Sequence, residues 1–299
     1  MQRLNDLFQD SSALVLDQGG TGGASRRGAL KLMLGAGYAA AAAPVVGQTA
    51  ITTPTDGLVT GEVSFAVDGA QVYAYRAAPQ GRTGLPVVLV VSEIFGVHEY
   101  IADVCRRLAR AGYLALAPDL FARQGDPMEY GEVARLMSEL IARVPDAQVM
   151  ADLDGAVQWA RAHGGDPDKV AITGFCWGGR ITWLYAAQAP VKAAVAWYGR
   201  LEGQASALTP RHPLDVAALL RAPVLGLYGE KDTGIALESV ERMKAALARG
   251  STAAKASQFV VYPDAPHAFH ADYRPSYRPQ AAQDGWQRML AWFRQQGVG

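Results

Sequence analysis

The sequence has 299 residues, half of them hydrophobic and 19% charged, which is an ordinary balance for a globular protein. Its 28 lysines and arginines equal its 28 aspartates and glutamates, so the formal net charge is zero. Without a basic excess the chain lacks the positive face that nucleic acids and anionic membranes attract, and we expect neither as a partner. The two cysteines, Cys105 and Cys176, are too few for a disulfide framework and are not spaced as a metal-ligand pair.

Residues 1–50 differ in composition from the rest of the chain. The pair Arg26-Arg27 precedes an apolar, alanine-rich run over residues 32–46, and this pattern is typical of an export signal. The run is shorter than the roughly 20 apolar residues that a membrane span needs. The sequence SRRGALK around the pair resembles a twin-arginine signal, which implies a periplasmic or secreted protein. We expect cleavage between about residues 43 and 50; an alanine-rich helix with a chance arginine pair is the alternative.

Strands and helices alternate after a short linker over residues 51–57. Residues 61–68 and 71–75 predict a hairpin around Gly69, and the β-branched run over residues 86–91 predicts a strand buried on both faces. Further strands are predicted at residues 113–118, 169–174, 192–197, 223–228 and 258–262. Helices are predicted at residues 99–111, 129–143, 147–163, 180–188, 237–249 and 280–296.

This alternation predicts an α/β fold with a mostly parallel central sheet and helices on both faces, because parallel strands need helical crossovers. A single catalytic domain over residues 58–297 accounts for the pattern. In such sheets the functional side chains lie in loops at the carboxyl ends of the strands. We therefore expect the chemistry just after residues 91, 118, 174, 197, 228 and 262.

Cys176 follows the predicted strand 169–174 in the sequence GFCWGG. A strand, a G-x-nucleophile-x-G turn and a helix form an elbow that lifts the nucleophile above the sheet, and its glycines leave room for the tight turn. The helix that follows directs its positive end at the thiol and favours the thiolate. We predict that Cys176 is the nucleophile; a buried structural cysteine is the alternative. Cys105, within the predicted helix 99–111, is expected to be structural.

The acid and the base should follow the nucleophile in that order along the chain. Asp232 comes directly after the strand 223–228, and His267 comes directly after the strand 258–262. The sequence thus predicts that His267 activates Cys176 and that Asp232 orients the imidazole. Glu230 and Asp264 are alternative acids that lie earlier in the same two loops.

Five motifs together resemble the dienelactone hydrolase (carboxymethylenebutenolidase) family. They are G-x-C-x-G-G at 174–179, E-I-F-G at 93–96, P-D-L-x-x-R at 118–123, Y-G-x-x-D at 228–232 and H-x-F at 267–269. The resemblance spans roughly residues 60–295 and implies an α/β-hydrolase fold that acts on enol-lactones without a cofactor or metal.

The resemblance also implies roles for residues outside the triad. Glu93 would contact the resting thiol and govern its ionisation, and the backbone N–H groups of Ile94 and Trp177 would form the oxyanion hole. An acidic residue after an apolar strand is costly unless it is paired or functional; the alternative is that Glu93 caps the next segment.

Candidates for substrate contacts are Phe95, Tyr198, Phe269 and Arg123. Well-known members of the family bind a substrate carboxylate through arginines, one of which lies four residues after the histidine, where this chain has Ala271. Arg274 or Arg278 could supply the charge instead. A second such arginine, expected within residues 129–143, matches neither Arg135 nor Arg143 with certainty.

We therefore predict a hydrolase that cleaves a small ester or lactone through a Cys-His-Asp triad and a thioester intermediate. A broader carboxylesterase or thioesterase is the first alternative, and a non-catalytic binding protein on the same fold is the second. The protein is expected to be a monomer or small homo-oligomer without stable membrane insertion.

Overall fold

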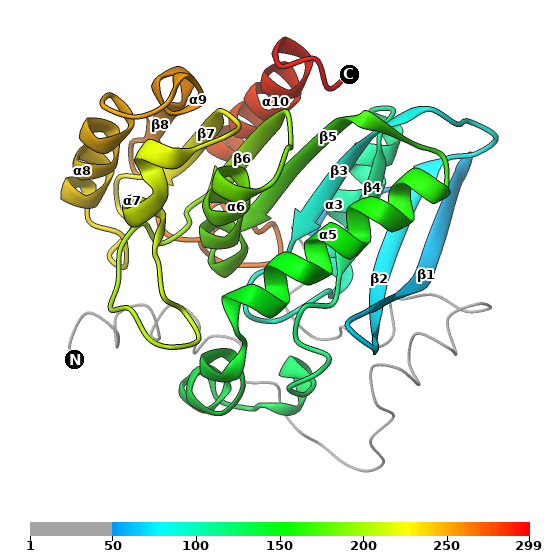
Figure 1. The fold of residues 1–299 in the computed structure, drawn as a ribbon, viewed down its shortest axis with the longest axis horizontal. Helices are drawn as coiled ribbons and strands as arrows, with labels where there is room; N and C mark the ends of the chain where they lie inside the picture. Colours follow the sequence, from blue (N-terminus) through cyan, green and yellow to red (C-terminus); the bar gives the residue numbers. More distant parts are fainter. Residues whose placement is uncertain (1–49) are drawn as a thin grey trace.

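The computed structural model describes residues 50–299, so the predicted export signal lies outside the described residues except for Ala50 (Figure 1). Eight strands form one sheet in the order β1-β2-β4-β3-β5-β6-β7-β8. Strand β2 pairs antiparallel with β1 and β4, and all other neighbours pair parallel. The strands are β1 (Leu58–Val67), β2 (Ala70–Pro79), β3 (Leu85–Val91), β4 (Leu114–Pro118), β5 (Gly165–Phe175), β6 (Ala193–Trp197), β7 (Val224–Gly229) and β8 (Gln258–Tyr262).

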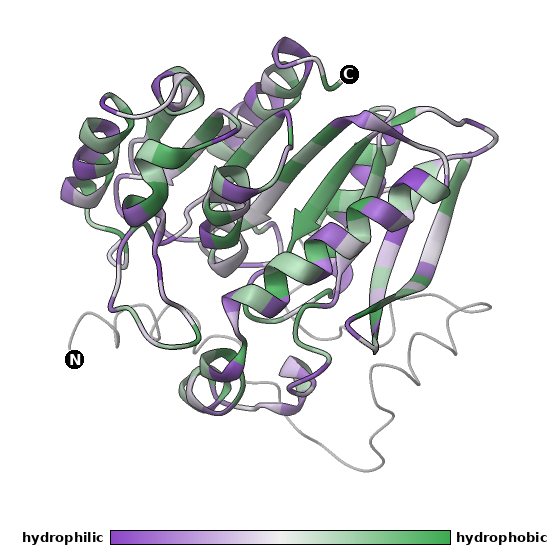
Figure 2. Cartoon of the chain, in the orientation of Figure 1, coloured by the Kyte–Doolittle hydropathy of each residue, from purple (hydrophilic) through white to green (hydrophobic). Residues whose placement is uncertain are grey.

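Helices cover both faces of this sheet, which confirms the predicted α/β architecture. Helices α5 and α6 lie on one face, and α3 and α10 lie on the other (Figure 1). The central strands are almost wholly hydrophobic, as strands buried on both sides must be (Figure 2). The longer helices are α3 (Glu99–Arg110), α5 (Asp146–Ala162), α6 (Trp177–Gln188), α8 (Leu237–Leu247) and α10 (Pro279–Gln295). Short helices that the sequence did not predict are α7 (Pro213–Val216), η6 (Ala217–Leu219) and α9 (Thr252–Ala256).

The segment from residue 127 to residue 143 is not the single helix that the sequence predicted. It is divided into η3 (Pro127–Glu129), α4 (Val133–Arg135), the π-helical turn η4 (Leu136–Leu140) and η5 (Ile141–Arg143). Leu136, Leu140 and Ile141 are all buried. Their spacing of four and five residues fits the wider i→i+5 turn better than a regular α-helix.

The chain changes direction across the sheet at β3. The strand that follows β3 in sequence, β4, lies on one side of it, and the next strand, β5, lies on the other. The two crossovers diverge here, and in open α/β sheets this divergence leaves a crevice at the carboxyl ends of the two strands. Glu93 follows β3 and Cys176 follows β5, so both lie at this point.

A sharp elbow joins β5 to α6, and Cys176 is the single residue between them. Its φ of 54° and ψ of −112° are rarely adopted by a residue with a side chain. Two backbone hydrogen bonds hold it there: its N–H donates to the Trp197 carbonyl at 3.0 Å, and its own carbonyl accepts from Arg180 N–H at 3.2 Å. The helix begins at Trp177, three residues earlier than predicted.

Glycines allow the first turn of α6 to lie directly against the ends of two strands. A Cβ on Gly178 would lie 2.6 Å from the carbonyl oxygen of Ser92, beyond the end of β3. A Cβ on Gly179 would lie 2.6 Å from the carbonyl oxygen of Trp197 and 2.8 Å from the Cα of Gly199, at the end of β6. These obstacles are backbone atoms that cannot rotate aside, so the requirement for glycine in the elbow is confirmed.

Replacing Gly179 by alanine is expected to destabilise the fold by about 1–3 kcal/mol, because the added methyl group forces the ends of α6 and β6 apart. Urea unfolding followed by circular dichroism measures this change. Gly131→Ala is the matched control, since nothing lies within 4 Å of the position of its Cβ. Equal free energies of unfolding for the two variants would contradict the proposed packing constraint.

Candidate active site

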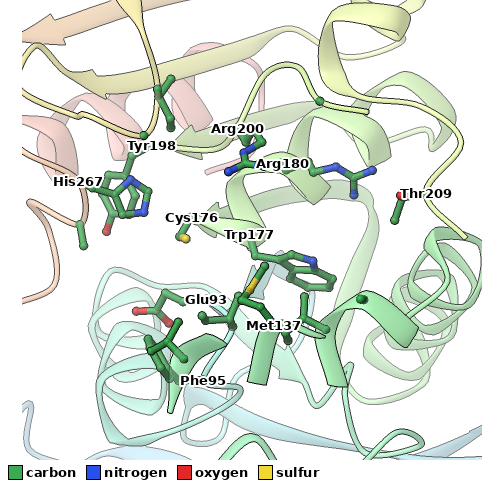
Figure 3. A pocket seen from close by; sticks show the side chains of 18 of the residues that line it. Glu93, Phe95, Met137, Cys176, Trp177, Arg180, Tyr198, Arg200, Thr209 and His267 are labelled. Atoms are coloured by element: carbon green, nitrogen blue, oxygen red, sulfur yellow. The ribbon is translucent and has the colours of Figure 1, made fainter. Parts of the chain in front are cut away.

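Cys176 lines a cavity of about 390 Å³ at the carboxyl ends of the parallel strands (Figure 3). Glu93, Ile94 and Phe95 enter the cavity from the loop after β3, and His267 enters it from the loop after β8. Most of the remaining wall is apolar. It includes Val133, Met137, Ile141, Trp177 and Ile235.

The imidazole of His267 and the carboxylate of Asp232 form a hydrogen-bonded pair. Nδ1 of His267 lies 2.7 Å from Oδ2 of Asp232, and the Asp232 side chain is fully buried. Oδ1 of Asp232 accepts a hydrogen bond from the backbone N–H of Gly234 at 2.9 Å, which fixes the carboxylate plane. Figure 3 shows the imidazole of His267 beside Cys176.

Backbone contacts between two loops bring this pair together. The N–H of Lys231, after β7, donates to the carbonyl of Ala265, after β8, at 3.0 Å. Glu230 and Asp264, the alternative acids, are both exposed in these loops, and Glu230 lies near Lys231 instead. Of the three acids, Asp232 is the one that contacts the imidazole of His267.

The charges around His267 favour its protonated form. Burial alone disfavours the imidazolium, but the carboxylate of Asp232 and the neighbouring sulfur of Cys176 outweigh burial and raise the pKa of His267 well above 6.5. Within the described chain, Nε2 of His267 has no hydrogen-bond partner that satisfies normal geometry. The ring nitrogen on the cavity side is therefore available to a reactant.

Glu93 is buried and has partners other than the thiol. Its Oε1 accepts from the hydroxyl of Tyr273 at 3.4 Å, and its Oε2 lies 3.4 Å from Nε2 of His98. Although burial opposes ionisation, the charges of His98 and Arg274 lower the pKa of Glu93. Among the described residues no hydrogen bond joins Glu93 to Cys176, although both line the cavity; the carboxylate lies between the Tyr273 hydroxyl and the ring of His98.

The two backbone N–H groups expected in the oxyanion hole both border the cavity. Trp177 opens α6, so its N–H has no acceptor within the helix. Ile94 lies just after β3, and the N–H of neither residue donates to another backbone group in the described part of the chain. The close approach of Gly178 to Ser92 brings these two segments together.

The four candidates for substrate contacts divide into two pairs. Phe95 and Tyr198 line the cavity, whereas Arg123 and Phe269 do not. The Arg123 guanidinium forms two hydrogen bonds of 2.7 Å to Asp152. Phe269 is fully buried in the core behind the site, where its ring packs against those of Trp197, Tyr198 and Tyr262.

Arg274, noted in the sequence without a firm role, lines the cavity together with two arginines that sequence reasoning missed, Arg180 and Arg200. Arg274 stacks on the ring of Phe95 at 5.1 Å, whereas Arg278 is exposed and bonds backbone carbonyls. Arg200 lies three residues after β6, so the rule that function follows strand ends could have identified it. Arg180 lies within a helix, and no sequence signal marks it.

Cys105 is fully buried in α3, and burial raises the pKa of its thiol, in agreement with a structural role. In residues 50–299 no group of three or more histidine, cysteine or acidic side chains is arranged to bind a metal. None of the helices in this region is long and apolar enough to cross a bilayer.

Comparison with known proteins identifies close relatives. The model of the dienelactone hydrolase family matches residues 72–297. A protein of Methylorubrum extorquens, provisionally named a carboxymethylenebutenolidase, is 56% identical over 276 residues, which are 92% of this chain and 94% of the relative. A protein of Escherichia coli with the same provisional name is 55% identical, and the alignment covers 87% of this chain and 96% of the relative. A crystal structure of a provisionally assigned dienelactone hydrolase from Klebsiella pneumoniae aligns with this chain with a TM-score of 0.77 and 57% sequence identity. The alignment covers 80% of this chain and 99% of the Klebsiella chain.

We expect His267 to remain protonated well above pH 6.5, because the carboxylate of Asp232 and the sulfur of Cys176 stabilise its positive charge. An NMR titration of its ring protons measures the midpoint, and the His267→Gln variant identifies the signal. Asp232→Asn removes the nearest negative charge and should lower the midpoint.

The same shift predicts the pH dependence of stability. The pKa of His267 is higher in the folded state than in the unfolded state, so protonation of His267 stabilises the fold. This stabilisation is fully present below about pH 6.5, the unfolded-state pKa. It is lost as the pH rises through the folded-state pKa. The difference in unfolding free energy between wild type and Asp232→Asn should shrink accordingly as the pH is raised. A wild-type midpoint at or below 6.5 would contradict the expected charge pairing.

Proposed function

Because the chain belongs to the dienelactone hydrolase family, we propose that it hydrolyses small esters or lactones with Cys176 as the nucleophile. His267 acts as the acid and base, and Asp232 orients the imidazole. The observation that carries the proposal is the strained elbow that presents Cys176 to the same cavity as His267, whose far nitrogen bonds Asp232.

The reaction proceeds in two halves. The thiolate of Cys176 attacks the carbonyl carbon, and the N–H groups of Ile94 and Trp177 stabilise the negative charge that develops on the carbonyl oxygen. The C–O bond breaks, and the leaving oxygen takes a proton from the His267 imidazolium. Water then attacks the thioester, gives a proton to His267, and releases the acid and the thiolate. No cofactor is required for these steps.

The charge arrangement suits this cycle. The raised pKa of His267 keeps the imidazolium available to protonate the leaving oxygen while the thiolate attacks. Glu93 remains ionised through His98 and Arg274, and as a second anion on the cavity wall it adds negative potential near the reacting atoms.

A broader carboxylesterase or thioesterase activity is the second candidate. Ala271 occupies the position of an arginine that well-known family members use for a substrate carboxylate, and Arg123 is already paired with Asp152. The cavity wall is also mostly apolar. These features favour neutral esters at least as much as a dienelactone.

Cys176→Ala is expected to reduce the hydrolysis of 4-nitrophenyl acetate by at least about a thousandfold, because the nucleophile is removed. Asp232→Asn should lower kcat by about a hundredfold or more, since the imidazole loses its orienting charge. Intact-protein mass spectrometry of acid-quenched wild type should detect one acetyl group on Cys176.

Cys105→Ala is the matched control and should retain activity, because its thiol is buried away from the cavity. Equal background rates for wild type and Cys176→Ala would favour the non-catalytic alternative for simple esters. Turnover of 4-nitrophenyl acetate without turnover of a dienelactone would favour the broader esterase.

We also propose that the protein is exported to the periplasm by a twin-arginine signal, with Arg26-Arg27 as the recognised pair. Cleavage before residue 50 would leave residues 53 and 54 in the mature chain. There the N–H of Thr53 donates to Asp103 at 2.5 Å, and the carbonyl of Pro54 accepts from Arg110, so this segment is bound to α3.

Replacing both Arg26 and Arg27 by lysine should abolish export, because twin-arginine recognition distinguishes arginine from lysine. Cell fractionation and N-terminal sequencing of the periplasmic protein measure the result. Arg3→Lys serves as a conservative control outside the motif. Uncleaved, cytoplasmic protein for wild type as well as for the double variant would refute export.

A further inference from the structure

Helix α3 carries three polar residues, Tyr100, Asp103 and Arg107, that lie one turn apart on the same side of the helix. Tyr100 and Asp103 are buried, with exposed fractions of 4% and 1%, and Arg107 is half-buried. None of the three lines the cavity, so the proposed reaction does not use them. Their contacts lead instead to the histidine loop, the loop of residues 263–278 that carries His267.

Two residues of this row contact the histidine loop. The hydroxyl of Tyr100 lies 2.5 Å from Nδ1 of His270, and the guanidinium of Arg107 donates to the carboxylate of Asp272. Burial and the positive charge of Arg107 keep the pKa of His270 well below 6.5, so its ring is neutral at ordinary pH. His270 and Asp272 follow His267 by three and five residues, so α3 holds the loop close to the proposed base.

The backbone next to His267 requires such support. Ala268 has a φ of 59°, a left-handed conformation that a residue with a Cβ adopts only where its surroundings impose it. Before His267 the loop is bound through the carbonyl of Ala265 to the loop after β7. After His267 it is bound to α3 through His270 and Asp272, so the imidazole lies between two anchored points.

The segment before β1 completes this network through its backbone. The N–H of Thr53 donates to the carboxylate of Asp103 at 2.5 Å, and the N–H of Ile51 forms a hydrogen bond with the carboxylate of Asp272. Asp103 also accepts from Nε of Arg107 at 2.5 Å. The side chain of Ile51 is exposed and that of Thr53 is half-buried, so the segment adds little to the apolar core. The two buried carboxylates therefore join this segment, α3 and the histidine loop.

We propose that Arg107 and Asp272 are positioning residues for His267. The backbone of residues 51–53 supports their contact, so the N-terminal segment acts on the active site without lining the cavity. The inference rests on the proposed hydrolysis at Cys176, in which a small displacement of the imidazole lowers the rate although no reacting group is lost.

The first test measures hydrolysis of 4-nitrophenyl acetate by Arg107→Gln and by Asp272→Asn. In each variant kcat should fall about tenfold or more while KM stays within about twofold, because the imidazole is displaced but the cavity wall is unchanged. The double variant should lose no more than either single variant, since both substitutions remove the same contact.

Asp152→Asn is the matched control for Asp272→Asn. The side chains of Asp152 and Asp272 are both 2% exposed, and each is paired with an arginine. Asp152 lies in α5 and does not line the cavity, so its replacement should leave kcat at the wild-type value. An equal loss of kcat in Asp152→Asn would show that any broken buried ion pair lowers the rate, and would overturn the positioning role.

The NMR midpoint of His267 tests the inference separately from turnover. Both single variants should lower the midpoint, because a displaced imidazole loses part of its contact with Asp232. Arg107→Gln removes a positive charge and Asp272→Asn removes a negative one, so an effect of charge alone would move the two midpoints in opposite directions.

A lower midpoint in both variants supports the inference even if wild type does not hydrolyse the ester, a result that would refute the proposed function alone. Unchanged kcat values together with unchanged or oppositely shifted midpoints would overturn the positioning role and leave hydrolysis at Cys176 intact.

Thr53→Pro tests the N-terminal segment, because proline lacks the N–H that the carboxylate of Asp103 accepts. Its kcat should fall about two- to tenfold, the factor that corresponds to one hydrogen bond. Thr52→Pro is the matched control, since the N–H of Thr52 donates to no backbone group within residues 50–299. Equal kcat values for wild type and Thr53→Pro would overturn the part of the inference that concerns this segment.

Discussion

The first turn of α6 lies in backbone contact with the ends of β3 and β6, and the rest of the site depends on this contact. Because Gly178 and Gly179 have no side chains, the helix approaches both strand ends closely enough for Cys176 to bridge β5 and α6 in a strained conformation. The same approach places the N–H of Trp177 near the loop that begins at Ser92. Cys176, the start of α6 and the backbone N–H groups of Ile94 and Trp177 thus form one rigid unit rather than separate features.

Balanced charges explain how a mostly apolar cavity holds so many ionisable groups. Asp232 stabilises the imidazolium of His267, and His98 and Arg274 stabilise the carboxylate of Glu93. Each buried charge has a partner of opposite sign, which limits the cost of removing it from water. Arg200, which is exposed at the cavity, has no such partner within residues 50–299.

Local sequence patterns identified the strands and the elbow, because residues that are adjacent in the sequence are sufficient to form each of these features. The apolar run of β3 and the glycines around Cys176 are each complete within a few positions. The segment from residue 127 to residue 143 was not predictable in this way. Its helical propensity favours one helix, whereas burial of Leu136, Leu140 and Ile141 together favours a π-helical turn, and burial is a tertiary effect.

The sequence alone therefore determined the fold class, the family, and the chain order of the proposed nucleophile, acid and base, since strand ends and short motifs encode all three. Only the tertiary structure decided which groups meet. It paired His267 with Asp232 rather than with Glu230 or Asp264, set Glu93 beside His98 and Tyr273, and placed Arg123 outside the cavity. It also brought Arg180, Arg200 and Arg274 to one cavity from distant parts of the chain. Such contacts depend on the side-chain directions that packing imposes, and sequence spacing does not record those directions.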